Sequence, residues 1–111
     1  MSDDLTPVSI ERRDGESLAL VLSGDVDIYC AAALRESAET LLQEQADIVV
    51  ACEGLSHLDT SALQVLLALR RELNLRGRSL RLSGVSSAVA GILQLAGVDA
   101  ALDCRAAASR D

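Results

Sequence analysis

The order of apolar and polar positions predicts that the chain opens with a β-hairpin. Residues 8–12 alternate between apolar and polar side chains, and residues 18–22 alternate within a longer apolar run. The pair Asp14-Gly15 lies between the two segments, and an Asp-Gly pair favours a two-residue hairpin turn. We therefore predict two antiparallel strands, the second of which is broken at residues 23–25, Ser-Gly-Asp.

Apolar residues at the three- to four-residue spacing of an amphipathic helix predict three helices. They cover about residues 31–45, 61–76 and 86–96. Ser86 or Ser87 can cap the third helix, and glycines at positions 77 and 97 end the second and the third. The apolar faces of the first two helices consist of Ala31, Leu34, Ala38, Leu41 and Leu42, and of Ala62, Val65, Leu66, Leu69 and Leu73.

Strand patterns separate these helices. The apolar run at residues 48–52 predicts a central strand covered on both faces, and residues 79–83 alternate as a short strand. Residues 98–102 are compatible with a closing strand, and residues 105–111 with a frayed end or an extension of a terminal helix. Strands joined through helices run parallel with right-handed crossovers, whereas the hairpin adds an antiparallel edge. We expect one α/β layer domain over residues 1–111, a mixed and mostly parallel four- to five-stranded sheet with helices packed on it.

Composition and charge limit the kinds of partner. The chain has 111 residues, half of them apolar, and its single aromatic residue is Tyr29. The formal charge of −7 and the lack of aromatic side chains for base stacking both argue against nucleic acid. Residues 1–62 carry thirteen acidic and three basic side chains, a net of −10, and residues 63–111 carry four and seven, a net of +3. The acidic half is either a solvated surface or a surface that faces a basic partner.

The motifs do not indicate catalysis or cofactor binding. The chain contains one histidine, His57, and no Gly-x-Ser-x-Gly elbow, so a hydrolase triad is not expected. It contains no lysine for a phosphate-binding loop and no Gly-x-Gly-x-x-Gly turn. Asp25 and Asp27 lack a third group for a metal site, and the three cysteines follow no metal-like spacing. We therefore predict no enzyme activity, no cofactor and no metal.

The sequence also lacks targeting patterns. Met1 leads directly into polar residues, without the basic and then apolar segments of a signal sequence. No apolar run approaches the roughly 18 residues that a membrane-spanning helix requires. We therefore expect a cytoplasmic domain that does not insert into a membrane.

The candidate chemistry lies in residues 54–63, where a predicted buried strand and a short loop give way to a helix. Asp59 is placed to cap that helix or to lie in its first turn, and Thr60 and Ser61 follow it. The free backbone N–H groups and the positive end of the helix dipole would point at a phosphate on either hydroxyl. Local chemistry alone leaves two interpretations open, an ordinary capped helix and a site of regulatory phosphorylation.

Two longer segments carry recognisable signatures. Residues 22–35, Leu-Ser-Gly-Asp-Val-Asp-Ile-Tyr-Cys-Ala-Ala-Ala-Leu-Arg, match a Leu-Ser/Thr-Gly-Glu/Asp-Leu/Val-Asp pattern followed by alanine and leucine. Residues 58–66, Leu-Asp-Thr-Ser-Ala-Leu-Gln-Val-Leu, resemble an Asp-Ser/Thr-Ser/Thr-Gly-Leu motif, with alanine in place of the glycine. With these segments the chain resembles the STAS family, specifically its bacterial anti-sigma factor antagonists. Residues 77–80 and 93–98 fit later family elements, so the resemblance spans about residues 8–103.

The resemblance implies a non-catalytic binding protein in a partner-switching pathway. The unmodified protein would bind an anti-sigma factor or a GHKL-type serine/threonine kinase. The kinase would phosphorylate the first hydroxyl after the motif aspartate, and a PP2C-type phosphatase would reverse the reaction. That hydroxyl belongs to Thr60, with Ser61 as the substitute acceptor. The residues expected to contact a partner are Asp25, Asp27, His57, Asp59, Thr60, Ser61, Ala62 and, exposed on the flank of the helix, Leu63 and Leu67.

Two departures from the motif and two alternative functions accompany this resemblance. The acceptor position, which more often holds serine, holds Thr60, and the motif glycine is replaced by Ala62, which is bulkier against an approaching partner backbone. The first alternative is a constitutive STAS subunit that binds the ATPase of a phospholipid ABC transporter, a group whose Asp-Thr-x-Gly-Leu motif also suits Asp59 and Thr60. The second is a stressosome or chemosensory scaffold protein.

Overall fold

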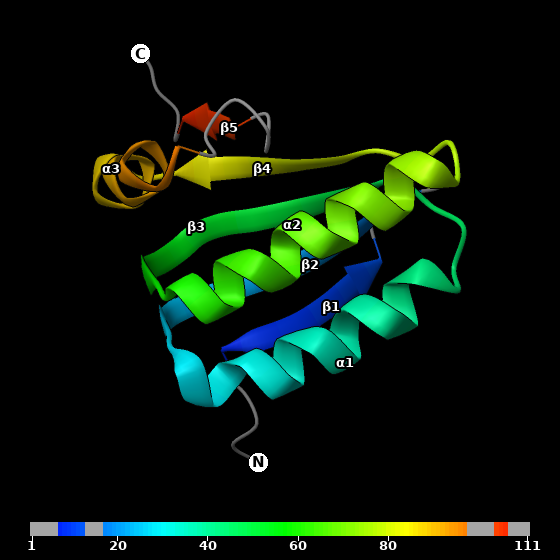
Figure 1. Cartoon of the computed structure of the whole chain (residues 1–111), viewed down its shortest axis with the longest axis horizontal. Coiled ribbons are helices and arrows are strands. Elements are labelled where there is room, and N and C mark those ends of the chain that lie inside the picture. The colour runs from blue at the N-terminus through cyan, green and yellow to red at the C-terminus, as the bar shows by residue number, and fades with distance from the viewer. Residues whose placement is uncertain (1–6, 13–16, 98–103, 107–111) are drawn as a thin grey trace.

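Strands and helices alternate after an opening pair of strands, as Figure 1 shows. The structure is a computed structural model, and it describes residues 7–12, 17–97 and 104–106 of the chain. The elements are β1 (Val8–Arg12), β2 (Leu18–Val26), the 3₁₀ helix η2 (Ile28–Cys30), α1 (Ala31–Leu42), β3 (Ile48–Leu58), α2 (Thr60–Leu75), β4 (Leu80–Val85), α3 (Ser87–Ala96) and β5 (Cys104–Ala106).

The strands form a five-stranded sheet with the order β1-β2-β3-β4-β5. β1 pairs antiparallel with β2, and each later pair of neighbours is parallel. This confirms the predicted mixed, mostly parallel sheet with an antiparallel edge. α1 and α2 lie side by side over one face of the sheet, whereas α3 is seen end-on beside β3 and β4 (Figure 1).

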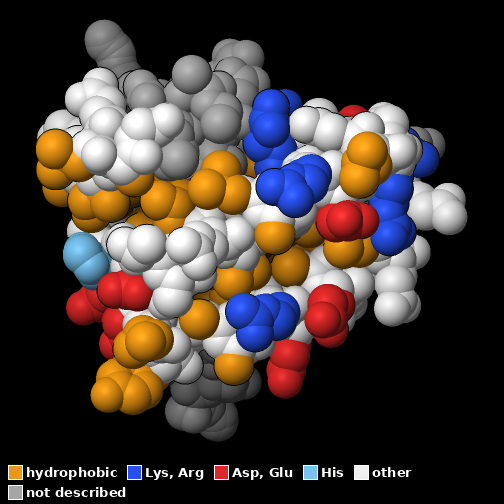
Figure 2. All heavy atoms as spheres, viewed as in Figure 1, with side chains coloured by type: hydrophobic (Ala, Val, Ile, Leu, Met, Phe, Trp, Pro, Cys, Tyr) orange, Lys and Arg blue, Asp and Glu red, His pale blue; other side chains and the backbone are white. Residues whose placement is uncertain are grey.

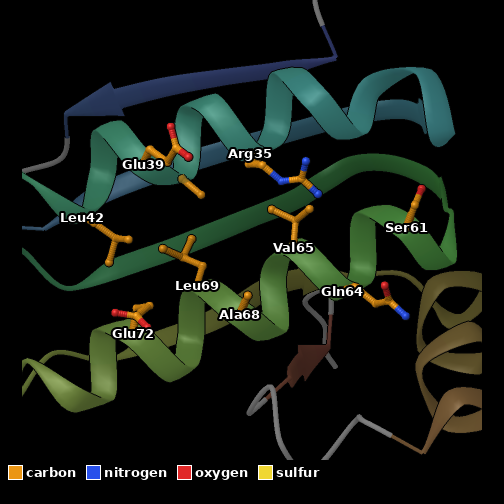
Figure 3. Close-up of a pocket in the computed structure, with 10 residues that line it drawn as sticks. Arg35, Glu39, Leu42, Ser61, Gln64, Val65, Ala68, Leu69 and Glu72 are labelled. Carbon is orange, nitrogen blue, oxygen red and sulfur yellow. The ribbon is translucent and has the colours of Figure 1, made fainter.

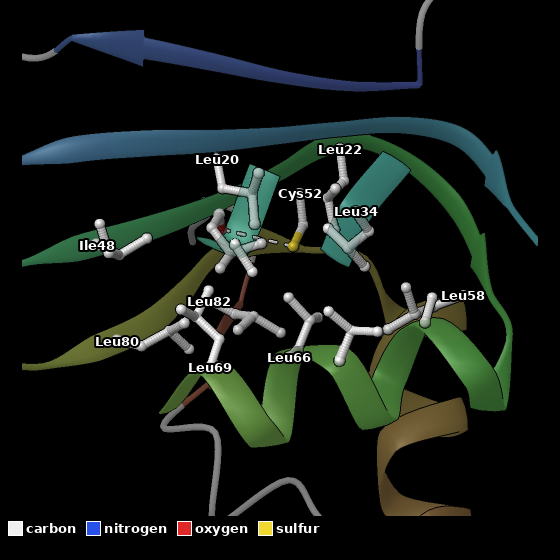
Figure 4. Close-up of a cluster of buried hydrophobic side chains, with 14 of the residues drawn as sticks. Leu20, Leu22, Leu34, Ile48, Cys52, Leu58, Leu66, Leu69, Leu80 and Leu82 are labelled. Atoms are coloured by element: carbon white, nitrogen blue, oxygen red, sulfur yellow. Dashed lines mark hydrogen bonds between the residues drawn. The ribbon is translucent and has the colours of Figure 1, made fainter. Parts of the chain in front are cut away.

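The core is a cluster of aliphatic side chains between the sheet and the helices. The register places Leu20 beside Val50 and Val50 beside Leu82, so one row of apolar side chains crosses three strands. Leu66 and Leu69 of α2 pack over this row (Figure 4). Because the chain contains no Phe or Trp, close packing here depends on the fit of branched aliphatic side chains.

The buried helix faces agree with the sequence periodicity. In α2 all the predicted residues are buried, namely Ala62, Val65, Leu66, Leu69 and Leu73. In α1 the buried residues are Leu34, Ala38 and Leu41, whereas Ala31 and Leu42 are half-buried. Val49 lies on the face of β3 directed away from α2 and is also half-buried. We predicted that β3 is covered on both faces, and at Val49 the outer face is covered only in part.

Two strands extend beyond their predicted ends. β2 is not broken at residues 23–25 but continues to Val26, because register shifts near Ser23 and after Gly24 absorb the irregularity. Gly24 has a φ of 70°, which glycine adopts without steric cost. β3 continues to Leu58, whose buried side chain ties this extension to the core. The predicted loop before α2 is thus replaced by one residue, Asp59.

Helix ends follow local backbone chemistry. α1 is preceded by η2 and ends at Leu42, before its predicted end, and Gln45 beyond it has a positive φ of 57°. At α3, Ser86 Oγ accepts a hydrogen bond of 3.2 Å from the Val89 N–H, and Gly97 ends the helix with a φ of 73°. These two caps were predicted. None of the helices in the described ranges is long and apolar enough to cross a membrane.

The closing strand lies later in the chain than predicted. β5 spans Cys104–Ala106 and pairs with β4, so the prediction of a frayed or helical end is wrong for residues 105 and 106. The strand is held by backbone pairing with β4. Its short run of polar and small residues has no apolar alternation, so the sequence pattern does not predict it. The predicted strand at residues 98–102 and the turn Asp14-Gly15 lie outside the described residues.

Substitution of a core leucine tests the assignment of the α2 face. Leu66 has no exposed surface, so Leu66→Ala removes buried carbon atoms and leaves a cavity under α2. We expect the free energy of unfolding to fall by about 2–5 kcal/mol, measured by urea denaturation followed by circular dichroism. Leu75→Ala is the control, because Leu75 is 75% exposed on the same helix. It should change the free energy by less than about 0.5 kcal/mol, and similar small losses in both variants would contradict the assignment.

Candidate functional site

The two segments singled out in the sequence meet at the carboxyl ends of β2 and β3. In the parallel register Asp25 lies opposite His57, and Val26 lies opposite Leu58. The Asp59 N–H donates a hydrogen bond of 2.9 Å to the Val26 carbonyl oxygen, which ties the end of β2 to the start of α2. Side chains far apart in the chain therefore share one edge of the sheet, which we call the β2–β3 edge.

Asp59 is the N-cap of α2. Its carboxylate oxygen Oδ2 accepts hydrogen bonds from Ser61 Oγ at 2.7 Å and from the Ser61 N–H at 3.0 Å. These two hydrogen bonds lower the pKa of Asp59 because they stabilise the ionised carboxylate, the side-chain bond having the larger effect. The charge of His57 lowers this pKa further, by less. The predicted cap is confirmed.

The two candidate hydroxyl groups differ in their surroundings. Thr60 is exposed as the first residue of α2, and its side chain makes no hydrogen bond to any of the described residues. Ser61 is half-buried, and its hydroxyl donates to Asp59. The Thr60 hydroxyl is thus accessible, whereas the Ser61 hydroxyl is engaged in the cap of α2.

Three of the expected partner contacts lie wholly or partly inside the molecule. Ala62 has no exposed surface and Leu63 is 4% exposed, so the prediction of an exposed Leu63 is wrong. Leu67 is half-buried and packs against the core. The reason is the helical phase: α2 starts at Thr60, and its first turn directs residues 62 and 63 toward the sheet. The methyl group of Ala62 therefore meets the core rather than an approaching partner.

The acidic residues of the first segment also have separate roles. Asp25 is exposed at the β2–β3 edge, opposite the exposed His57. Asp27 is half-buried, and its Oδ1 accepts a hydrogen bond of 3.0 Å from the Tyr29 N–H, so it caps η2. Among the residues that the structure describes, no three His, Cys, Asp or Glu side chains are grouped to hold a metal ion.

A groove between α1 and α2 begins beside Ser61 and was missed by sequence reasoning (Figure 3). Its cavity volume is about 260 Å³. Val65 and Leu69 of α2 and Leu42 of α1 line it, and charged side chains of both helices border it. Periodicity indicates the buried face of each helix but not the space left where two helices meet, so the groove had no sequence signal.

Comparison with known proteins decides the family. A family model described as "Mlab, STAS domain" matches residues 9–103. The chain belongs to the STAS domain family. The resemblance carried by residues 22–35 and 58–66 is thereby confirmed.

Over most of its length this STAS domain is similar to anti-sigma factor antagonists. It is 23% identical over 100 residues to the anti-sigma-B factor antagonist of Bacillus subtilis (strain 168), covering 89% of this chain and 92% of the relative. Its fold matches the Bacillus cell fate determinant SpoIIAA in the phosphorylated form with a TM-score of 0.70 at 22% identity, covering 93% of this chain and 92% of that one. The anti-sigma factor antagonist SpoIIAA in its unphosphorylated form matches with a TM-score of 0.67 at 23% identity, covering 79% and 82%. The predicted α/β fold class is confirmed.

The cap makes the stability of this STAS domain depend on pH in a defined direction. The folded-state pKa of Asp59 lies below its ordinary value of 3.8, so the ionised carboxylate stabilises the fold above that value. This contribution is lost as the pH falls through the lowered pKa. Asp59→Asn keeps an acceptor for the cap but cannot titrate. We expect wild type to exceed Asp59→Asn in free energy of unfolding near neutral pH and to converge with it as the pH falls through the lowered pKa of Asp59.

Urea denaturation of both proteins at a series of pH values measures this difference. A difference that stays constant, or that grows as the pH falls, would contradict the role of the ionised Asp59 in the cap. Ser61→Ala provides the matched check, because it removes the strongest hydrogen bond to Asp59 and should weaken the pH dependence.

Proposed function

We propose that this STAS domain is a non-catalytic regulatory binding protein of the anti-sigma factor antagonist type, which changes partners through reversible phosphorylation of Thr60. The observation that carries the proposal is the difference between two neighbouring hydroxyls. Thr60 is exposed, whereas Ser61 donates a hydrogen bond of 2.7 Å to Asp59. A kinase can therefore reach Thr60 without breaking the cap of α2. Ser61 is the substitute acceptor, at the cost of that hydrogen bond.

The partner of the unmodified domain is an anti-sigma factor or a GHKL-type serine/threonine kinase. In the forward step Thr60 Oγ1 bonds to the γ-phosphorus of ATP, the bond from that phosphorus to the β–γ bridging oxygen breaks, and ADP leaves. The hydroxyl proton passes to a base of the kinase. A PP2C-type phosphatase reverses the modification: water attacks the phosphorus, the bond from phosphorus to Thr60 Oγ1 breaks, inorganic phosphate leaves, and the hydroxyl of Thr60 is restored. The domain supplies the acceptor in one step and the phosphorylated side chain in the other.

The surroundings of Thr60 explain how one phosphate can change affinity without changing the fold. The phosphate adds about −1.5 to −2 units of charge at neutral pH. It would lie at the amino end of α2, where free N–H groups and the helix dipole favour negative charge. Transfer requires Thr60 to face the terminal phosphate of bound ATP. The product phosphate would then face the nucleotide phosphates of the kinase, and this repulsion would drive the partners apart.

The relatives support this proposal. The curated relative is named an anti-sigma-B factor antagonist, and SpoIIAA has been solved in a phosphorylated and an unphosphorylated form. The present fold matches both forms, with TM-scores of 0.70 and 0.67. This similarity to both forms agrees with a phosphorylation that changes the surface of the domain and leaves its fold unchanged.

A second candidate is a constitutive subunit that binds the ATPase of a phospholipid ABC transporter and is not phosphorylated. The observation that favours it is the Asp59-Thr60 pair, which also fits the Asp-Thr-x-Gly-Leu motif of that group. In this candidate the β2–β3 edge would still contact the partner, but Thr60 would act as a permanent contact. The two candidates therefore differ in whether the Thr60 hydroxyl is ever modified.

Phosphate transfer separates the two candidates. The domain is incubated with ATP and each purified GHKL-type kinase from the genome that encodes it, and is then examined by intact-mass and peptide analysis. We expect wild type and Thr60→Ser to gain one phosphate at position 60, because both keep an accessible hydroxyl. Thr60→Val keeps the shape of the side chain and should gain none, while Ser61→Ala should still be modified. Stable binding without any mass gain would favour the constitutive subunit.

A charge at position 60 should imitate the phosphorylated state. We expect Thr60→Glu to weaken binding of the ADP-loaded kinase by at least about 30-fold, because its carboxylate would face the nucleotide phosphates. The thermal transition should remain nearly unchanged, since an acid in the first turn of a helix is favourable. Thr60→Gln has the same size without charge and should bind far more tightly than Thr60→Glu. Equal affinities for wild type and Thr60→Glu in a calorimetric titration would refute the switch.

A further inference from the structure

η2 carries an exposed apolar tip next to the β2–β3 edge. Ile28 is 60% exposed and Tyr29 is 89% exposed. The other exposed large apolar side chains in the described ranges belong to β1, α2 and α3 and stand singly. Figure 2 shows an exposed apolar group adjoining acidic side chains at the end of the molecule where α1 begins in Figure 1. We call Ile28 and Tyr29 the η2 tip.

Hydrogen bonds fix the turn that carries the η2 tip. Asp27 Oδ1 accepts the Tyr29 N–H at 3.0 Å, and the Asp27 carbonyl oxygen accepts the Cys30 N–H at 3.0 Å. The Ala31 N–H donates to the Ile28 carbonyl oxygen, which joins the turn to α1. The backbone is thus ordered before any partner arrives, and this lowers the entropic cost of binding through these side chains.

The η2 tip and Thr60 lie on the same part of the surface. Cα atoms of η2 and α2 approach within 8 Å of one another. The hydrogen bond of 2.9 Å between the Asp59 N–H and the Val26 carbonyl oxygen joins the residues that lead into these two elements. A protein that encloses Thr60 for phosphate transfer would therefore lie beside η2.

The η2 tip differs from ordinary surface apolar residues, which occur singly and need no explanation. Ile28 and Tyr29 are consecutive, and Tyr29 is the one aromatic residue of the chain. With 89% of its surface exposed, Tyr29 contributes almost nothing to the core. Tyrosine offers a large contact area with few rotatable bonds, and it is enriched at the energetic centres of protein interfaces.

We propose that the η2 tip is the apolar anchor by which the GHKL-type kinase recognises this domain. This inference rests on the proposed function and adds the chemistry of the partner surface. That surface is an apolar pocket bordered by arginine or lysine, because the exposed Asp25 lies on the strand that leads into η2. The face of the Tyr29 ring also accepts a stacked guanidinium group. The anchor holds the domain while Thr60 is presented to the nucleotide.

Binding and phosphate transfer test the anchor, with the whole chain and each purified GHKL-type kinase from the genome that encodes it. Tyr29→Ala should weaken binding of the ADP-loaded kinase by about 30-fold or more. It should raise KM for the domain and leave kcat unchanged, because Tyr29 does not touch the transferred phosphate. Leu75→Ala removes a side chain of comparable exposure, 75%, at the other end of α2 and should behave as wild type.

The outcomes separate this inference from the proposed function. If a kinase binds and modifies wild type, and Tyr29→Ala has the same affinity and KM, the anchor is refuted and the proposed function stands. If none of the kinases binds or modifies wild type, the proposed function fails and the anchor fails with it. A loss of affinity in Leu75→Ala equal to that in Tyr29→Ala would also refute the anchor, because the effect would not be local.

A pair of variants at Asp27 tests its role as a positioning residue for Tyr29. Asp27→Asn keeps an acceptor for the Tyr29 N–H without the charge, whereas Asp27→Ala removes both. We expect Asp27→Asn to bind nearly as wild type and Asp27→Ala to lose about 10-fold in affinity. Equal losses in both variants would show that the charge matters and not the turn, and would refute the positioning role.

Discussion

The hydrogen bond from the Asp59 N–H to the Val26 carbonyl oxygen is the constraint on which the site depends. The bond lies beside the buried side chains of Val26 and Leu58, where competition from water is reduced. It holds together the end of β2, the end of β3 and the start of α2. Once Asp59 is held there, its carboxylate can cap α2 and bind the Ser61 hydroxyl, and Thr60 is left to solvent. The two adjacent hydroxyls therefore differ: that of Ser61 is held in a hydrogen bond, and that of Thr60 is free to react.

Much of the fold could be predicted from the sequence because apolar residues recur at a regular spacing along any helix or strand that buries one face. The buried face of α2 and the sheet with one antiparallel edge followed from helical spacing and from the rules for strand connections. The strand ends could not be predicted from local signals. Residues 23–25 resemble a turn, yet pairing with β3 carries β2 through them to Val26. Residues 56 and 57 are polar, yet buried leucines on either side keep them in β3.

The sequence predicted which functional groups make up the candidate site, but it predicted less well which of their side chains face solvent. The spacing of Asp59, Thr60 and Ser61 predicted a capping acid with hydroxyls in the first turn, and the geometry agrees. Which neighbours face solvent depends on the phase of α2, which its first residue determines, and Leu63 was assigned to the wrong side for this reason. The exposure of Tyr29 arises from the 3₁₀ turn before α1, whose presence the helical pattern does not reveal.

The η2 tip suggests how duplicated STAS domains can come to differ in the partners that they bind. Its side chains lie largely outside the core, so replacing them should alter folding stability by no more than about 0.5 kcal/mol. Asp27 and the backbone around it maintain the turn whatever side chains it displays. Gene duplication could therefore produce copies that share one architecture and differ in two neighbouring surface positions. If the η2 tip is the proposed anchor, such copies would each bind a different kinase, and parallel signalling circuits in the same cell would stay insulated from one another.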